Sequence, residues 1–276
     1  MKQIAEPFVE TAPHRARATL TGSEGAGTSV AEEAGRRVKK TVLELGGSDA
    51  FIVMPSADLD AAVYTAVTAR TINNGQSCIC AKRFIVADSI ADEFTKRFVE
   101  RMRALVVGDP MDERTNIGPL ATAQGRDDLD DQVKRSVAGG ARVLLGGKRR
   151  EGPGYFYEPT VLTDVGFDSP AFREETFGPV IPIIRCPDDI AEVIRISNST
   201  AFGLSSGVCT NRLDYITRFI NGLEVGTVNI WEVPGYRIEM SPFGGIKDSG
   251  LGYKEGVWEA MKSYTNVKTY SLPWPA

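Results

Sequence analysis

The chain has 276 residues, of which 42% are hydrophobic and 25% charged, a composition typical of globular proteins and sufficient for one large domain or two small ones. Its 32 Lys and Arg and 36 Asp and Glu give a formal net charge of −4 with both signs interspersed, so we expect no nucleic-acid partner. The N-terminal segment lacks the apolar run of a signal peptide, and no stretch approaches about 18 apolar residues, so we expect a cytoplasmic protein without a membrane contact.

The cysteine count indicates reduced thiols. Four cysteines are too few for a disulfide framework in a chain of this length, and each one needs its own explanation: Cys78, Cys80, Cys186 and Cys209. We predict no metal site.

The first informative segment in chain order is LTGSEGAGTSVAEEAG, which reads as an apolar strand followed by a Gly-rich turn and a helix. Backbone N–H groups at such a helix start suit a phosphate group, and Ser23 can add a hydroxyl. The segment is not GxGxxG, so on its own it is weak evidence for a nucleotide.

The second segment, TVLELGGSD, contains Glu44 where an all-buried strand would have an apolar residue. Burial of a carboxylate beside Gly46 and Gly47 can raise its pKa into the range of a general base. The alternative is a surface glutamate on an edge strand, or a member of a structural ion pair.

Short β-branched runs alternate with amphipathic stretches, a pattern typical of an α/β protein whose parallel strands are joined by helices. The predicted buried strands span residues 41–45, 50–54, 83–87, 142–145, 180–184 and 227–230. The predicted helices span residues 56–72, with Ser56 as its capping residue, and 89–105, 127–138, 188–198 and 211–221. The C-terminal VKTYSLPWPA predicts a strand and a Pro-terminated tail, with the strand paired to a distant strand or to another subunit.

The most informative segment for chemistry is NNGQSCICAKRF. A thiol just past a helix end, close to Lys82 and Arg83, can be exposed to substrate and held partly as thiolate, which favours Cys78 as a nucleophile. Two buried structural cysteines flanking a strand explain the spacing equally well, because free cysteine is among the most buried residue types.

The segment FREETFGPV places two acids, Glu174 and Glu175, directly before a Gly-Pro turn. Adjacent carboxylates cannot both be buried without partners, so at least one should face a polar ligand, a cation or water. A solvated loop is the alternative.

In this order, the TGS turn, LELGG, GQxC, EETFGPV and PFGGIKDSG resemble the aldehyde dehydrogenase superfamily, from about Ala18 to Lys268. The resemblance implies a three-layer α/β catalytic domain at residues 47–247, preceded at residues 1–46 by the remnant of a Rossmann-like NAD(P)-binding domain. It also implies that residues 248–276 return to the cofactor domain and carry an oligomerisation strand of a homodimer or homotetramer.

The resemblance assigns roles residue by residue. Cys78 matches the nucleophile, which forms a thiohemiacetal and then a thioester, and Glu44 matches the general base. The positions that match cofactor contacts, for NAD or NADP, are Gly22 and Ser23 near the pyrophosphate, Gly46 between cofactor and nucleophile, Glu175 on the nicotinamide ribose and Phe177 beside the ring.

The chain departs from the family pattern in the groups that would bind the oxyanion and the cofactor. The family's PWN amide is absent, and Met1 falls partway into the region that binds the cofactor, so we expect the isolated chain to bind NAD or NADP poorly and to turn over near background. A non-catalytic structural remnant and an acyl-transferring enzyme that uses CoA remain alternatives.

The substrate indicated by the resemblance is a small anionic aldehyde. The first two thirds of the chain look similar to succinate-semialdehyde dehydrogenases, whereas the last third looks similar to phosphonoacetaldehyde and related (lactaldehyde-type) dehydrogenases. The arginines by which these enzymes differ near the nucleophile are replaced by Ile72 and Ser77. Arg237 is then the candidate for the substrate anion, or a solvated loop residue, and Ser77, directly before the nucleophile, is a second predicted substrate contact. Cys80 matches a resolving thiol in some succinate-semialdehyde enzymes, although a small buried strand residue is the favoured interpretation.

Overall fold

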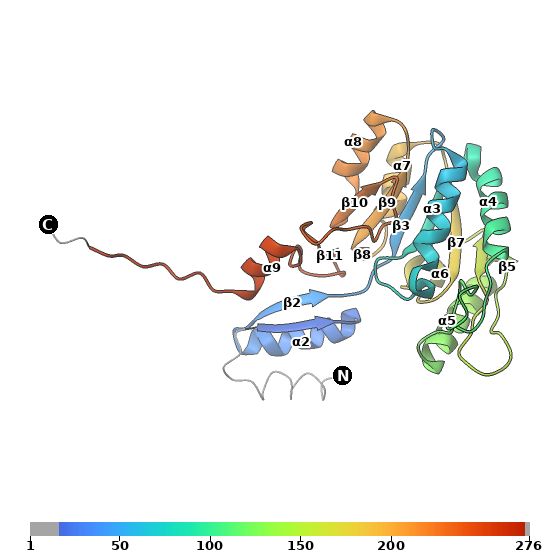
Figure 1. Cartoon of the computed structure of the whole chain (residues 1–276). Helices are drawn as coiled ribbons and strands as arrows, with labels where there is room; N and C mark the ends of the chain where they lie inside the picture. The colour runs from blue at the N-terminus through green and yellow to red at the C-terminus, as the bar shows by residue number, and fades with distance from the viewer. Residues whose placement is uncertain (1–16, 274–276) are drawn as a thin grey trace.

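The centre of the computed structural model, which describes residues 17–273, is a seven-stranded sheet (Figure 1). Its strand order is β10 (Thr227–Ile230), β9 (Ser205–Cys209), β3 (Asp49–Val53), β4 (Ala81–Ala87), β7 (Val180–Cys186), β6 (Thr160–Thr163) and β5 (Arg142–Leu145). All neighbouring strands are parallel except β5 and β6. The predicted α/β class is therefore confirmed.

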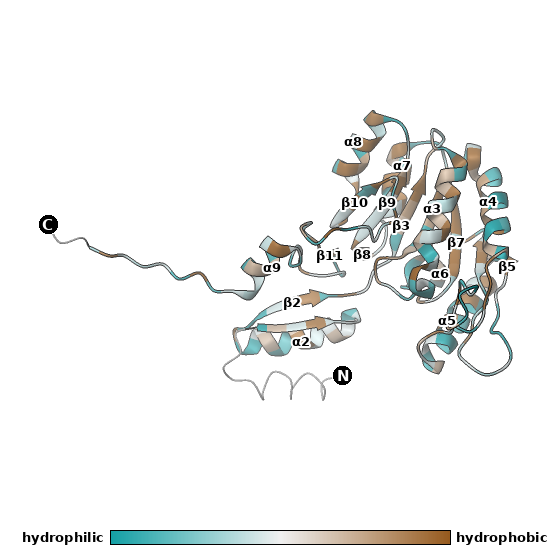
Figure 2. Cartoon of the chain, viewed as in Figure 1, coloured by the Kyte–Doolittle hydropathy of each residue, from teal (hydrophilic) through white to brown (hydrophobic). Residues whose placement is uncertain are grey.

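The sheet is buried on both faces because successive side chains of a strand point to opposite sides. In β3, Phe51 and Val53 join one apolar core, whereas Ala50 and Ile52 join the other. Helices α3 (Leu59–Thr71) and α4 (Asp88–Arg103) cover the first core. The second core is covered by α5 (Ala123–Ala138), α6 (Pro170–Arg173), α7 (Ile190–Asn198) and α8 (Leu213–Gly222). Figure 2 shows the apolar strands between these helices.

The predicted helix at residues 56–72 begins later than its predicted cap. Asp58 is the N-cap of α3 and accepts a hydrogen bond from the backbone N–H of Ala61 at 3.0 Å. The hydroxyl of Ser56 instead lies 2.9 Å from that of Thr210, at the end of β9. The capping prediction for Ser56 is wrong because this side chain ties two strand ends together.

Two strands of the sheet escaped prediction, β6 and β9. In β9 the residues Ser205, Ser206 and Gly207 are all buried, yet they carry no apolar periodicity. A Cβ on Gly207 would lie 3.1 Å from the ring of Phe51, so this strand packs through small residues rather than large ones.

A smaller unit lies beside the main sheet and consists of β1 (Arg17–Thr21), α2 (Glu24–Arg36) and β2 (Lys40–Glu44) (Figure 1). The expected strand and helix are present, but the expected Gly-rich turn is itself the start of α2, with Ser23 as its N-cap. A Cβ on Gly27 would lie 2.5 Å from the side chain of Leu45, so glycine allows the helix to pack closely on this unit.

The C-terminal part of the chain returns to the smaller unit. After the short antiparallel pair β8 (Phe202–Gly203) and β11 (Ile246–Lys247), the N–H of Leu45 donates to the carbonyl of Ser249 at 3.1 Å. Helix α9 (Val257–Tyr264) follows, and the Tyr264 hydroxyl lies 3.3 Å from that of Thr19.

Beyond α9 the described chain is extended and solvent-exposed, as the red trace in Figure 1 shows. The described residues 265–273 form no strand, so the predicted pairing with a distant strand of the same chain is wrong for this part. Pairing with another subunit stays a prediction. The Pro-terminated end of the tail (274–276) and the first 16 residues of the predicted cofactor remnant lie outside the described residues. No helix within residues 17–273 has both the length and the apolar character needed to cross a membrane.

Candidate active site

The loop that carries Cys78 begins with a left-handed turn. Helix α3 ends at Thr71 and is followed by the 3-10 helix η1 (Ile72–Gly75), in which Asn73 and Asn74 have φ of 52° and 55°. Gly75 has φ of 74°, and a Cβ there would lie 2.3 Å from the carbonyl oxygen of Gly178. Glycine is therefore required where the loop turns toward β4.

Cys78 is half-buried at the end of this loop. Burial raises the pKa of its thiol to about 11, and the charges of Asp49, Glu44 and Glu175 act in the same direction, whereas Lys82 lowers it. The expectation that the thiol is held partly as thiolate is thus wrong for this structure, because burial outweighs the single nearby ammonium. A base is needed to remove its proton at neutral pH.

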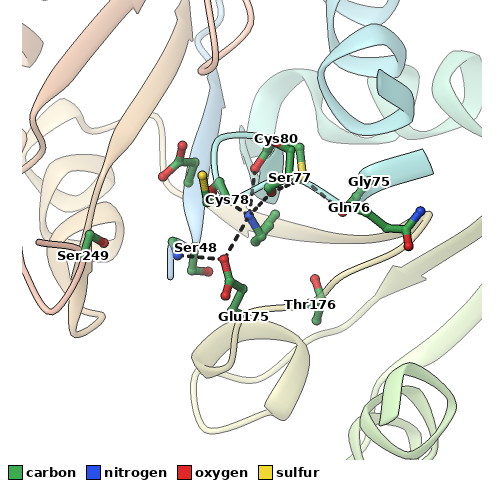
Figure 3. Close-up of polar contacts among 12 residues, drawn as sticks. Ser48, Gly75, Gln76, Ser77, Cys78, Cys80, Glu175, Thr176 and Ser249 are labelled. Carbon is green, nitrogen blue, oxygen red and sulfur yellow. Dashed lines mark hydrogen bonds and ion pairs between the residues drawn. The ribbon is translucent and has the colours of Figure 1, made fainter. Parts of the chain in front are cut away.

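The two cations expected beside the thiol have different surroundings. The ammonium of Lys82 donates to the carbonyls of Ser77 and Cys78, each at 2.8 Å. Figure 3 labels these two residues together with Glu175. The guanidinium of Arg83 is directed elsewhere and donates to the carbonyls of Ser48, Ile196 and Ser197. Its predicted place beside the thiol is wrong, because successive side chains of β4 point to opposite faces of the sheet.

The double glycine after β2 lets three segments meet. A Cβ on Gly46 would lie 2.0 Å from a carboxylate oxygen of Glu24, and a Cβ on Gly47 would lie 2.6 Å from the carbonyl of Cys78. The backbone N–H of Gly47 donates to Oε1 of Glu175 at 2.8 Å. Side chains at either position would separate the nucleophile loop from this carboxylate.

The two adjacent acids after α6 point to different partners. Glu174 forms an ion pair with Arg135 at 2.8 Å on the surface. Glu175 turns inward, where burial raises its pKa and the charge of Lys82 lowers it, with their nearest charged atoms 3.6 Å apart. Phe177 remains 40% exposed. The prediction that these carboxylates need polar or charged partners agrees with both environments.

A cavity of about 530 Å³ brings together most of the residues to which the resemblance assigns roles. Among its lining residues are Gly22, Ser23, Gly46, Ser77, Cys78, Glu175 and Phe177. The sequence analysis assigned no role to its other lining residues, Thr21, Leu45 and Gln76, although they lie within the TGS, LELGG and GQxC motifs. The described residues contain no group of His, Cys, Asp and Glu suited to a metal ion.

Glu44 lies outside the lining of this cavity. Its carboxylate is buried at the end of β2 and lies 2.8 Å from the ammonium of Lys254, which is also buried. Burial raises the pKa of Glu44, and Lys254 lowers it. The alternative of a surface glutamate is therefore wrong, whereas the ion pair is present.

Arg237 also lies outside the cavity lining, in an exposed loop after β10. Its guanidinium forms an ion pair with Glu255 and lies 4.6 Å from the ring centre of Phe243. The charge of Arg237 lowers the pKa of Glu44, so this loop and the end of β2 share one electrostatic environment.

Cys80 is buried, and its thiol donates to the carbonyls of Gly75 and Ser77 at 3.3 and 3.0 Å. It also contacts Arg70 at 3.4 Å, a fully buried arginine that donates to the backbone carbonyl of Thr176. The sequence reasoning missed Arg70 because its partners lie on distant parts of the chain. The resolving role of Cys80 stays a prediction.

Comparison with known proteins extends over nearly the whole chain. The sequence model of the aldehyde dehydrogenase family matches residues 2–270. A succinate-semialdehyde dehydrogenase [NADP(+)] of Mycobacterium avium is 54% identical over 257 residues, which cover 93% of this chain and 54% of that protein. A Mycobacterium ulcerans relative of the same description is 53% identical, with 93% and 56% covered. The chain thus spans about half the length of the curated relatives it matches.

Solved structures agree with the fold. Lactaldehyde dehydrogenase from Escherichia coli superposes with a TM-score of 0.88 at 36% identity, covering 95% of this chain and 54% of that one. A glyceraldehyde-3-phosphate dehydrogenase of Methanocaldococcus jannaschii, solved with NADP, superposes with a TM-score of 0.86 at 40% identity, covering 91% and 53%. Together with the family match, these similarities confirm the resemblance predicted from the motifs, and the chain belongs to the aldehyde dehydrogenase family.

Proposed function

We propose that this chain carries the catalytic part of an enzyme that oxidises a small anionic aldehyde, foremost succinate semialdehyde, to its acid with NADP or NAD. The observation that carries the proposal is the single cavity lined by Cys78, Glu175 and Ser23. These residues come from three distant segments, and each has the chemistry that one part of the reaction needs.

The lining of the cavity fits the reactive part of a dinucleotide. Gly22 and Ser23 lie at the N-terminal end of α2, where backbone N–H groups favour phosphate. Oε1 of Glu24 is buried without a hydrogen-bond partner, and a ribose hydroxyl would give it one. Glu175 would hold the nicotinamide ribose, and Phe177 would pack beside the ring. The bound nicotinamide supplies the acceptor for the hydride.

The chain's own residues account for the remaining steps. The Cys78 sulfur bonds to the aldehyde carbon as its proton passes to Glu44, and the backbone N–H of Cys78 would stabilise the resulting alkoxide. Glu44 passes the proton that it took from Cys78 on to solvent and becomes a base again. After oxidation, water adds to the thioester carbon while Glu44 takes a proton from it, and the C–S bond then breaks to release the acid and the thiolate. Glu44 has to leave Lys254 to reach Cys78, since it does not line the cavity.

The choice of substrate and cofactor is supported by the relatives. Those at 52–54% identity are described as succinate-semialdehyde dehydrogenases with NADP, whereas the lactaldehyde dehydrogenase structure is 36% identical. A lactaldehyde-type substrate is therefore the second candidate. Arg237 would bind the substrate carboxylate by exchanging it for Glu255.

The proposed domain arrangement follows the sequence prediction. The smaller unit up to Gly46 belongs to the cofactor-binding part, residues 47–247 form the catalytic domain, and residues 248–276 return to the cofactor part and pair between subunits of a homodimer or homotetramer. The cytoplasmic location stays a prediction from the sequence.

Protection of Cys78 from a thiol reagent tests this function without requiring a bound cofactor. Succinate semialdehyde should slow the alkylation of Cys78 by iodoacetamide, because the thiohemiacetal has no free thiol. Butanal has the same number of carbon atoms but no carboxylate, and we expect it to protect at higher concentration only. If neither aldehyde protects Cys78, the chain is a structural remnant and the proposal fails.

The variant Arg237→Ala tests the substrate class in the same assay. Loss of one charge-assisted contact should raise the concentration of succinate semialdehyde needed for half-protection about tenfold. Protection by butanal should not change. An equal effect on both aldehydes would assign Arg237 a structural role instead.

A further inference from the structure

We propose that Lys82 is a positioning residue that couples the nucleophile loop to the carboxylate of Glu175 and supplies the positive charge on which the reactivity of Cys78 depends. The proposal rests on the proposed function for the roles of Cys78 and Glu175. Its geometry comes from contacts that surround one buried ammonium.

Lys82 is fully buried on β4, a strand in which every residue is buried. Taking an ammonium out of water is costly unless polar groups surround it. Its close partners are the carbonyls of Ser77 and Cys78, both at 2.8 Å, and Oε1 of Glu175 at 3.6 Å. All three partners belong to the candidate active site. The buried ammonium therefore stabilises the geometry of this site rather than the packing of the sheet.

These contacts fix two reacting groups relative to each other. Because the carbonyl of Cys78 is held, the peptide plane that carries the thiol has a defined orientation. Oε1 of Glu175 lies 3.6 Å from the ammonium and accepts a hydrogen bond from the N–H of Gly47 at 2.8 Å. Its other oxygen lies beside Gly46, 2.9 Å from where a Cβ would stand, at the cavity lining. One side chain thus orients the nucleophile and presents the carboxylate proposed to hold the cofactor.

The charges that face Cys78 come from four segments. Asp49 on β3, Glu44 on β2 and Glu175 after α6 oppose ionisation of the thiol, and Lys82 on β4 favours it. Without Lys82 three carboxylates would remain with no cation among these groups. The thiolate would then be much harder to form.

The test is the rate at which iodoacetamide alkylates Cys78 in the full chain without cofactor, measured by peptide mass spectrometry from about pH 7 to about pH 9. In Lys82→Met, a neutral variant of similar length, we expect the rate to fall about tenfold at each pH, which is the effect of a rise of one unit in pKa. A merely structural role predicts the opposite sign, because a loosened loop exposes the thiol and speeds alkylation.

Two further variants distinguish the effect of the Lys82 charge from an effect on folding. Arg83→Met removes the neighbouring buried cation, whose partners are carbonyls of Ser48, Ile196 and Ser197, and Cys78 should be alkylated at the wild-type rate even though the melting temperature falls. Lys82→Gln keeps N–H donors without the charge, and it replaces Lys82→Met if the latter does not fold. Rates in Lys82→Met or Lys82→Gln equal to or above wild type would overturn the proposal. Protection of the wild-type chain by aldehyde tests the proposed function separately.

Discussion

The two cysteines of the nucleophile loop differ in what surrounds their sulfur atoms. Cys78 lines the cavity, whereas the thiol of Cys80 is buried and donates to carbonyls of its own loop. Their side chains are two positions apart, yet only one sulfur can meet a substrate. At residue scale, catalysis then depends on which base removes the proton of Cys78, since burial raises its pKa to about 11.

The variant Glu44→Gln tests this base. With p-nitrophenyl acetate, an activated ester that acylates a thiol without any hydride transfer, we expect the burst of nitrophenolate to become slower, because the thiol has lost its base. The steady-state release that follows should be slowed by about 100-fold, because water is no longer activated. Stopped-flow absorbance separates the two phases. Cys78→Ala should abolish the burst. A steady-state rate unchanged in Glu44→Gln would assign deacylation to another group.

The partner of Glu44 should control the pH dependence of this step. Lys254 lowers the pKa of Glu44, which burial raises. Lys254→Met should therefore raise that pKa further, so that Glu44 is protonated at higher pH and the acid limb of the deacylation profile moves upward.

A matched control for Lys254→Met exists on α9, where Lys262 forms an exposed pair with Glu259, also at 2.8 Å. Lys262→Met should leave the profile in place, because exposed pairs contribute little. An acid limb that moves downward in Lys254→Met, or not at all, contradicts the pairing of Lys254 with the base.

At the scale of elements, strands β3 and β9 are tied by a buried carboxylate. Asp49 accepts from the backbone N–H and the hydroxyl of Ser205 at 3.0 and 2.6 Å. Burial nevertheless raises its pKa from 3.8 to about 6, and Lys82, the contacts with Ser205, and Arg83 lower it only partly. Compared with the unfolded chain, the native state therefore favours the protonated acid up to about pH 6.

The raised pKa of Asp49 makes the stability of the chain depend on pH in a defined direction. The contribution of Asp49 to the free energy of unfolding is fully present below its unfolded pKa of 3.8 and is lost as the pH rises through about 6. The loss is up to about 3 kcal/mol for a shift of the pKa from 3.8 to about 6. Relative to wild type, Asp49→Asn should gain up to that amount between about pH 4 and about pH 7. Urea unfolding at several pH values measures it, and a constant difference would argue against the raised pKa.

What the sequence could predict differs between elements for a physical reason. Strands β3, β4 and β7 are runs of large apolar residues, so their burial is visible in composition. Strand β9 was missed because its burial depends on small residues that fit Phe51 of a neighbouring strand. The motif order predicted most of the residues that line the cavity, but the pairing of Glu44 with Lys254 joins distant segments and required the fold.

At the scale of the whole molecule, the C-terminal segment at residues 257–273 contains no buried residue. Val267, Tyr270 and Leu272 are 94%, 83% and 73% exposed, and α9 buries none of its residues. Exposed apolar side chains along an extended segment are typical of surfaces that pair with another chain.

We therefore expect the purified chain to form a homodimer or larger homo-oligomer through this segment. Light scattering after size-exclusion chromatography should give a mass that falls to that of the monomer when Tyr270→Lys and Leu272→Lys are combined. Val38→Lys is a matched control, since Val38 is 95% exposed but lies outside the segment. A wild-type chain of monomer mass would contradict the prediction.

The number of residues in the link between β2 and β3 determines where Glu44 lies relative to the nucleophile loop. Glu44 ends one strand and Asp49 begins the next, with Gly46 and Gly47 pressed between the nucleophile loop and two carboxylates. One residue inserted here would displace the proposed base along the strand axis by about 3 Å, the rise of a single strand residue. The length of this link should therefore be as intolerant of change as its glycines, whereas the exposed turn at residues 150–154 has room for insertions.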